Sequence, residues 1–270
     1  MKQPDEAAGQ NRTGKEGTMS RLVEDTRTVI WKEWKELLTL RGSTRSGIMG
    51  LVVSVGVFGI LLPIQLGQEL VLVPSVLLFW AWVPLLLVVA VIADAFAGER
   101  ERHTLETLLA SRLSDRAILL GKIGAAVLYG WGLTLLSLAL GLITVNVANV
   151  AQGWVEGPVL FPPMTLLGVI GASFLTAWMA AGAGVLVSLR AGTVRQAQQT
   201  LSIGVMILLF GTVYGLRALP QAAQLRLLEL LSALGTGGLV LAIGTILLII
   251  DVALFWAASA RFQRDRLILD

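Results

Sequence analysis

The segment DAFAGERERHTLETLLASRLSDRAILLGK, residues 94–122, carries dense charge between two long apolar stretches. It opens with a mixed-charge run made up of Glu99, Arg100, Glu101 and Arg102. Thr104 then begins a short predicted helix that ends at Ala110. Three leucines fall on one face of this helix at i, i+3, i+4 spacing: Leu105, Leu108 and Leu109. The pattern predicts a helix that binds a partner, and the alternative is a loop whose charges are merely solvated.

Composition places the chain in a membrane. Hydrophobic residues make up 55% of it, charged residues 14%, and the mean hydropathy is +0.77. A soluble domain carries about 25% charged residues. The chain has no cysteine, which excludes disulfides and thiolate metal sites. Its single histidine, His103, cannot build a multi-histidine metal site, and no pattern indicates nucleic-acid binding.

Six apolar stretches are each long enough to cross a bilayer, which takes about 20 helical residues. The expected spans are Gly47–Leu66, Leu72–Ala93, Ile118–Val147, Leu166–Leu189, Leu201–Leu219 and Gly235–Ala258. The fold class is therefore an all-α integral membrane protein. We expect a disordered tail over residues 1–19, an interfacial helix and connection over 20–46, the six-helix domain over 47–260 and a C-terminal tail over 261–270. The third span is long enough to tilt, or to bend near Gly130 and Gly132.

The segment 20–41 alternates charge with apolar residues that include two tryptophans. A helix with one apolar face, rich in Trp and flanked by Lys, Glu and Arg, is typical of a helix lying in the bilayer interface. The residues expected on that face, besides Val29, are Ile30, Trp31, Trp34, Leu37 and Leu38. We expect this helix to lead into the first span.

The basic residues specify an orientation. If the N-terminus is cytoplasmic, all of the 21 Lys and Arg residues except Arg217 and Arg226 lie on the cytoplasmic side. Positive charge accumulates on that side of membrane proteins. Both termini and the 94–122 segment are therefore predicted to be cytoplasmic. On the opposite side, residues 217–233 form a proline-started amphipathic run that we expect to dip back into the outer leaflet as one or two short helices.

Two features lie within the apolar stretches. Asp251 lies ten residues before Arg261, near mid-membrane, where a carboxylate costs about 2.5 kcal/mol or more and is a functional candidate by default. It is otherwise a protonated acid or a hydrogen-bonding group between spans. The fourth span is rich in Gly, Ala and Ser, which either let helices approach closely or line a conduit.

No catalytic constellation is present in the sequence. A phosphate cradle of the Gly-x-x-x-x-Gly-Lys-Ser/Thr type is missing, as are His-Glu-x-x-His and Gly-x-Ser-x-Gly. We therefore predict that the chain is not an enzyme. Any nucleotide hydrolysis must come from another subunit.

The run from Ala97 to Ala110, with Leu113-Ser114-Asp115-Arg116 and Leu119-Leu120-Gly121-Lys122 after it, resembles the first cytoplasmic loop of ABC-2 type transporter permeases. His103 stands where that family usually has Gly, and Arg112 where it usually has Pro. The six spans, the interfacial helix and the outer segment before the sixth span resemble the family as well.

The resemblance implies a permease subunit of an ATP-driven transporter in the cell membrane, and an exporter rather than an importer. It implies association with cytoplasmic ATP-binding-cassette subunits, which would bind ATP and Mg²⁺, and with a second permease copy or a paralogue. This chain would hold no cofactor itself. Residues 99–110 would form the coupling helix, with the leucines in a groove of the ATPase, the charges at its rim, and the interfacial helix bracing it.

Two other functions stay open at this stage. A membrane scaffold would use the same loop to hold a soluble partner without transport. A proton-coupled carrier would use Asp251, although such carriers usually show inverted repeats and more intramembrane charge.

Overall fold

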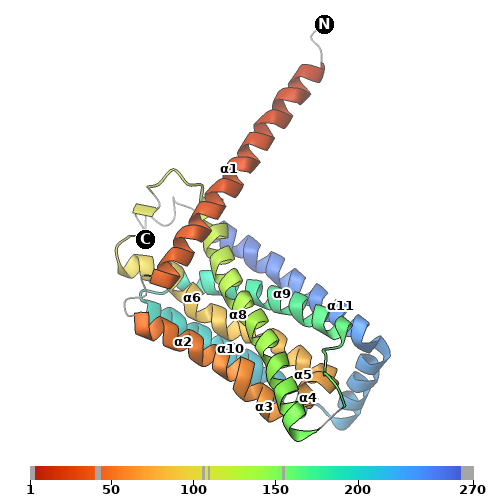
Figure 1. Cartoon of the computed structure of the whole chain (residues 1–270). Helices are drawn as coiled ribbons and strands as arrows, with labels where there is room; N and C mark the ends of the chain where they lie inside the picture. The colour runs from red at the N-terminus through yellow and green to blue at the C-terminus, as the bar shows by residue number, and fades with distance from the viewer. Residues whose placement is uncertain (1–3, 40–43, 105–106, 109, 154–155, 263–270) are drawn as a thin grey trace.

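The computed structural model describes residues 4–39, 44–104, 107–108, 110–153 and 156–262, and over these ranges the regular structure is entirely helical. Six helical segments are long and apolar enough to cross a membrane, which confirms the predicted fold class. These segments are Met49–Leu66, Val76–Glu101, Asp115–Gln152, Pro163–Ser188, Val194–Ala218 and Gln221–Arg261. Figure 1 shows them as a bundle, with the N-terminal helix leaning across one end.

Helix α1 (Pro4–Thr39) begins much earlier than the sequence suggested. A disordered tail was predicted over residues 1–19, whereas the structure has residues 4–19 as the first part of α1. Once the packed part of a helix has nucleated, each further residue adds a hydrogen bond at low cost, and the Ala, Glu and Lys residues of this stretch are good helix formers.

The first two spans are assembled from short pieces. Helix α2 (Thr44–Gly56) continues through a π-helical turn at Val57–Leu61 into α3 (Leu62–Leu66). Helices α4 (Glu69–Leu72) and α5 (Pro74–Phe79) and a 3₁₀ turn at Trp80–Trp82 then lead into α6 (Val83–Glu101). Prolines in the first turn of α3, α5 and α6 explain the breaks, because proline suits a helix start and not a helix interior.

Helix α8 (Asp115–Gln152) begins where Ser114 accepts a hydrogen bond from the backbone N–H of Ala117, a standard N-cap. The charged segment is therefore mostly helical: only residues 102–114 connect α6 to α8, whereas a loop over 94–122 was expected. Helix α8 also runs without interruption past Gly130, where a Cβ atom would lie 2.4 Å from Cγ2 of Val88. This glycine lets α8 approach α6.

Helix α9 (Pro163–Ser188) is the buried centre of the bundle and packs against α6, α8, α10 and α11. A Cβ atom at Gly168 would lie 2.5 Å from Val240, and one at Gly184 would lie 2.2 Å from Ile92. Of the two interpretations of the small residues, these contacts support close helix packing at both positions.

Helix α10 (Val194–Ala218) lies at the periphery, and α11 (Gln221–Arg261) contains a sharp change of direction. Gly235 has φ 61° and ψ 178°, which only glycine adopts readily. The residues from Gln221 to this kink form one short helix before the sixth span. A short helical segment was predicted there, as one helix or two, and the structure has one.

Candidate functional site

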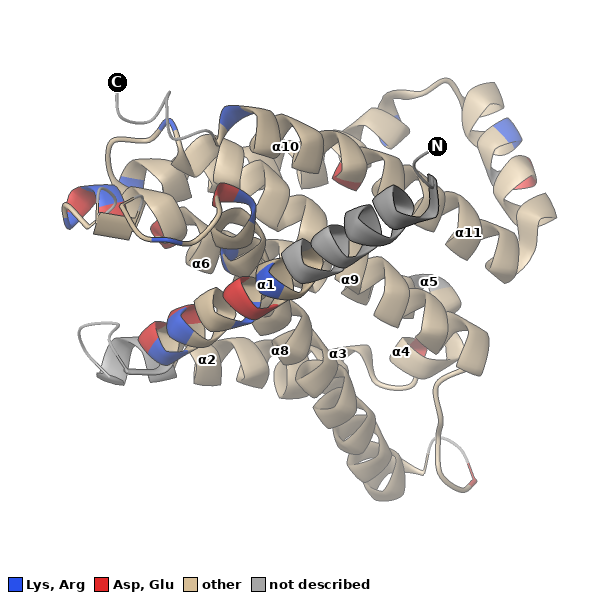
Figure 2. Ribbon diagram, turned by 90° about the horizontal axis from the view of Figure 1, so that it is seen from above, with Lys and Arg blue, Asp and Glu red and all other residues tan. Residues whose placement is uncertain are grey.

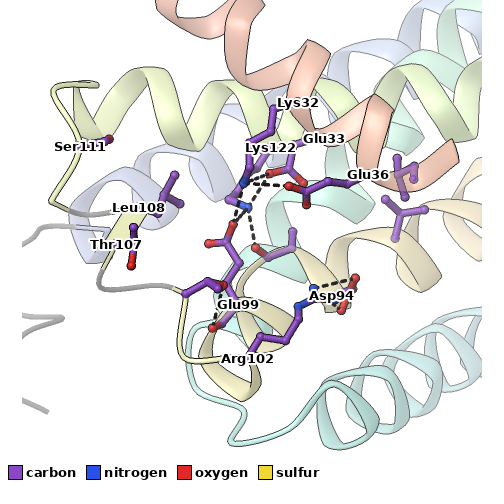
Figure 3. Close-up of a pocket in the computed structure, with 14 residues that line it drawn as sticks. Lys32, Glu33, Glu36, Asp94, Glu99, Arg102, Thr107, Leu108, Ser111 and Lys122 are labelled. Carbon is purple, nitrogen blue, oxygen red and sulfur yellow. Dashed lines mark hydrogen bonds and ion pairs between the residues drawn. The ribbon is translucent and has the colours of Figure 1, made fainter. Parts of the chain in front are cut away.

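The C-terminal end of α6 meets α1 and α8 around a buried lysine. The side chain of Lys122, from α8, is 1% exposed. Its ammonium donates hydrogen bonds to Glu33 Oε1 at 2.7 Å, to Glu99 Oε1 at 2.8 Å and to the carbonyl oxygen of Ala95 at 2.8 Å (Figure 3). All three N–H donors of the ammonium are therefore used.

Lys32 extends this cluster toward solvent. Its ammonium lies 3.3 Å from Glu99 Oε1 and 3.3 Å from Glu36 Oε1. Burial lowers the pKa of Lys32, but the carboxylates of Glu99, Glu33 and Glu36 outweigh burial, so the pKa lies above its ordinary value. We call Lys32, Glu33, Glu36, Glu99 and Lys122 the ionic cluster; it holds three carboxylates and two ammonium groups.

The close approach of α1 and α8 makes the ionic cluster possible. At Gly121, the residue before the buried lysine, a Cβ atom would lie 2.5 Å from Val29 of α1. Val29 itself is 2% exposed. A side chain larger than hydrogen at position 121 would therefore push α1 away and open the ion pairs.

Other contacts hold the end of α6 against α9. The Arg100 guanidinium donates to the carbonyl oxygens of Leu189 and Ala191 at 3.0 and 3.1 Å, just past the C-terminus of α9, where positive charge is favourable. The Ser188 hydroxyl bridges α9 to α6, since it donates to the Ala93 carbonyl and accepts from the Ala97 N–H.

The mixed-charge run, residues 99–102, therefore makes more contacts within its own chain than predicted. Glu99 was expected at the rim of a partner's groove, but the residue is 5% exposed and is paired with lysines. Arg100 was expected there as well and instead binds the end of α9. The reason is geometric: α6 continues through Glu101, so these side chains lie on a packed helix.

The exposed members of the run make weaker contacts within the chain. Glu101 accepts a hydrogen bond from the N–H of Val194 at 3.3 Å, and Arg102 lies 3.2 Å from Asp94. The Thr104 hydroxyl donates to the Glu99 carbonyl oxygen at 3.3 Å. His103 has φ 55°, in the left-handed region that suits the glycine of the family pattern.

The predicted short helix is only partly described. The N–H of Leu108 donates to the Thr104 carbonyl oxygen at 3.1 Å, which makes one helical turn. Leu108 packs against the apolar core of its own chain, whereas an outward orientation was expected. The other residues predicted for the coupling face, Leu105, Glu106 and Leu109, lie outside the described residues.

The apolar face predicted for α1 is packed against the rest of the chain only in part. Ile30 lies over Gly124, and Leu37 packs against the core, whereas Trp31 is 73% exposed and Trp34 is half-buried. The side of α1 that faces α8 also carries Val29 and Glu33, and Glu33 pairs with the buried ammonium. The side chain of Leu38 lies outside the described residues.

A cavity of about 600 Å³ adjoins the ionic cluster. Its walls combine charged groups with apolar side chains, among them Glu36, Leu37, Val91, Asp94, Glu99 and Leu108. Glu99 Oε2 is buried and has no hydrogen-bond partner among the residues that the structure describes. Figure 3 shows this oxygen pointing away from Lys122, toward the side where Thr107 and Leu108 lie.

Asp251 lies in α11, far along the chain from this cluster. The residue is 4% exposed, and neither carboxylate oxygen has a hydrogen-bond partner within the described part of the chain. The proposed hydrogen bond to a neighbouring span is therefore not formed among those residues. No group of three or more His, Asp or Glu residues in the described ranges could hold a metal ion.

The sequence interpretation did not identify the groups that α1 and α9 contribute. Lys32, Glu33 and Glu36 looked like the solvated face of an interfacial helix, and Ser188 looked like one small residue among many. One signal was available: Lys122 lies within an apolar run, and a buried ammonium requires an anionic partner from elsewhere in the fold.

A helical bundle with six candidate spans and a charged α6–α8 connection defines an integral membrane protein. A sequence model described as "ABC-2 family transporter protein" matches residues 62–260, most of the chain, and the chain belongs to that family. The family forms the transmembrane component of ABC transporters, whose ATP-binding subunits are separate. A comparison with curated proteins finds no match.

Proposed function

We propose that this chain is the permease subunit of an ATP-driven exporter and that the α6–α8 connection, residues 102–114, couples it to separate ATP-binding-cassette subunits. The observation that carries the proposal is the way the two ends of this connection are held. Glu99, near the end of α6, and Lys122, early in α8, form a buried ion pair, and Arg100 binds the end of α9. A displacement of the connection therefore moves α6, α8 and α9 together.

Helix α1 takes part in the same movement. The ion pair between Glu33 and Lys122 attaches it to α8, and Lys32 bridges it to Glu99 of α6. In the proposed mechanism, ATP binding brings two ATPase subunits together, the connection follows them, and a path between two permease subunits changes its access. The exposed Glu101, Arg102 and Thr104 supply contacts to the ATPase, together with the predicted face of Leu105, Glu106 and Leu109.

The proposed orientation places both termini and the α6–α8 connection in the cytoplasm of a cell with the permease in its plasma membrane. The distribution of Lys and Arg supports it. In Figure 2 the charged residues gather along α1 and around the α6–α8 connection, whereas the helices of the bundle are mainly uncharged.

A second permease copy or a paralogue completes the proposed transporter. Helix α10 supports this, because its apolar side chains are largely uncovered within one chain. Those exposed by about 40% or more include Ile203, Met206, Ile207, Phe210, Val213 and Tyr214. Lipid covers whatever part of this surface the second subunit leaves free.

The first experiment is co-purification with the ATPase encoded beside the gene, followed by ATP hydrolysis in lipid with and without the permease. We expect a stable complex whose hydrolysis depends on this chain. The double variant Glu106→Arg, Leu109→Asp should lose the ATPase yet still insert into the membrane. Glu156→Arg, in the α8–α9 connection at the other end of the bundle, is the matched charge reversal and should retain the ATPase. If the double variant still binds the ATPase, the docking assignment is wrong.

The alternatives predict different results. A scaffold would bind a soluble partner without any dependence of ATP hydrolysis on the permease. A carrier that uses Asp251 would transport in the absence of an ATPase and would lose transport in Asp251→Asn.

A further inference from the structure

We infer that the cavity beside the ionic cluster binds a primary ammonium group carried on a small organic body, with Glu99 Oε2 as the acceptor of its N–H. This site goes beyond the proposed coupling function and does not depend on it.

The first argument is the unsatisfied oxygen. A buried carboxylate oxygen without a hydrogen bond is costly, and native proteins satisfy nearly all such atoms. The Glu99 side chain lines the cavity, and its buried Oε2, which has no partner among the described residues, points toward the side where Thr107 and Leu108 lie (Figure 3). Lys122 cannot serve it, because its three donors already bind Glu33, Ala95 and Glu99 Oε1. The cavity therefore presents an acceptor that lacks a donor.

The second argument is charge. The ionic cluster holds one more carboxylate than it holds ammonium groups, and the neighbouring Asp94 and Arg102 neutralise each other. A bound water could donate a hydrogen bond but would leave the excess negative charge. A cation with an N–H group satisfies both requirements, and hydrogen bonds between ionised groups are roughly twice as strong as neutral ones.

The third argument is size and wall chemistry. A volume of about 600 Å³ lies within the range of small-molecule sites and far exceeds a bare ion. Leu37, Val91 and Leu108 supply apolar wall for the organic part of a ligand. The ammonium could be carried by a free amine or by the ethanolamine headgroup of a lipid, and both present the same N–H donors.

The test measures the thermal unfolding of the purified full-length chain in detergent during titration with n-butylammonium chloride. Tetramethylammonium chloride is the matched control, because it has the charge but no N–H. We expect a saturable rise in Tm with n-butylammonium and none with tetramethylammonium at equal ionic strength. Glu99→Gln should weaken the apparent affinity by about tenfold or more. Glu101→Gln, which removes a carboxylate outside the cavity, should not change it.

A second variant tests the site without touching the ion pairs. Thr107 is exposed and lines the cavity, so Thr107→Trp should fill the entrance and reduce binding even if Glu99→Gln fails to fold. Reconstitution then distinguishes the two sources. A higher Tm in phosphatidylethanolamine than in phosphatidylcholine, with little further gain from n-butylammonium, indicates a lipid headgroup. Equal Tm values in the two lipids, with a gain in both, indicate a free amine.

Three results would overturn the inference. One is an n-butylammonium response no larger than that of tetramethylammonium, and another is an undiminished response in folded Glu99→Gln and Thr107→Trp. The third is a response that disappears when the ATPase is bound, which would assign the cavity to a basic side chain of the partner.

Discussion

At the scale of single residues, two buried charged groups have opposite surroundings. The Lys122 ammonium has three acceptors, two of them carboxylates from α1 and α6. The Asp251 carboxylate has none among the described residues. Because a buried charge is costly unless it is paired and hydrogen-bonded, removing the first should destabilise the fold and removing the second should not.

Lys122→Met should lower the thermal stability strongly. The change leaves the Glu33 and Glu99 carboxylates buried without their ammonium partner, a cost of about 3–5 kcal/mol. Thermal unfolding in detergent, followed by tryptophan fluorescence, measures the effect. Arg27→Met, which replaces an exposed cation of the same helix, is the matched control and should change Tm little. Equal Tm values for the two variants would show that the ion pairs do not hold α1 to the bundle.

Asp251→Leu should raise the stability. A leucine of similar size removes two unsatisfied oxygens, with an expected gain of about 1–3 kcal/mol. The same unfolding assay measures it, and transport by the complete complex is the second readout. A stable variant that no longer transports would assign Asp251 a role with substrate or protons. A large loss of stability would mean that the carboxylate has a partner in the assembled transporter.

At the scale of helices, glycines set how closely the elements approach. Gly121 allows α1 to pack closely against α8, Gly130 does the same for α6 and α8, and Gly184 for α9 and α6. Each lies directly against a β-branched side chain: Val29, Val88 and Ile92, respectively. Membrane helices lack a hydrophobic force to hold them together, so this close packing contributes much of their association.

Gly184→Ala should separate α9 from α6. The new Cβ would lie 2.2 Å from Cγ2 of Ile92, and overpacking of this kind costs about 1–3 kcal/mol. Gly171→Ala is the control on the same helix, because nothing lies within 4 Å of its Cβ position. Comparison of the two Tm values tests the contact, and adding Ile92→Ala to Gly184→Ala should restore part of the loss. An unchanged Tm in Gly184→Ala would mean that the helices shift apart freely.

At the scale of the whole molecule, the two ends of the bundle differ in chemistry. The end with α1 and the α6–α8 connection contains the ionic cluster, the adjoining cavity and most of the basic residues (Figure 2). At the other end, Asn146 and Asn149 bind the backbone at Val159 and Gly157 and fix the α8–α9 connection without basic side chains. This asymmetry is the basis of the proposed orientation, because positive charge accumulates on the cytoplasmic side of membrane proteins.

Single-cysteine labelling should place the two ends on opposite sides of the membrane. The chain has no cysteine, so Thr107→Cys and Glu156→Cys each introduce a unique thiol at an exposed position. A membrane-impermeant maleimide should label Glu156→Cys in intact cells and Thr107→Cys only in inverted vesicles. The reverse pattern would invert the proposed topology, and labelling of both in intact cells would contradict the assignment of the spans.

The helical spans were predictable because each is a local property of composition and length. The site was predictable only in part. Glu99 and Arg100 were predicted to lie at the rim of a partner's groove, but their partners within the chain, Lys122 and the carbonyl groups beyond α9, lie 23 to 91 residues away. No periodicity reports on contacts between segments so far apart, so both residues were predicted to be exposed.

The sequence by itself determined that this chain is an all-α membrane protein with six spans and that its charge gathers at one end. Hydropathy and charge decide those properties, because each span depends only on its own length and on how apolar its residues are. Only the tertiary structure decided which charges are buried and paired. The ionic cluster exists because glycines bring α1, α6 and α8 close enough for Lys122 to reach two carboxylates, a condition that depends on distances between helices.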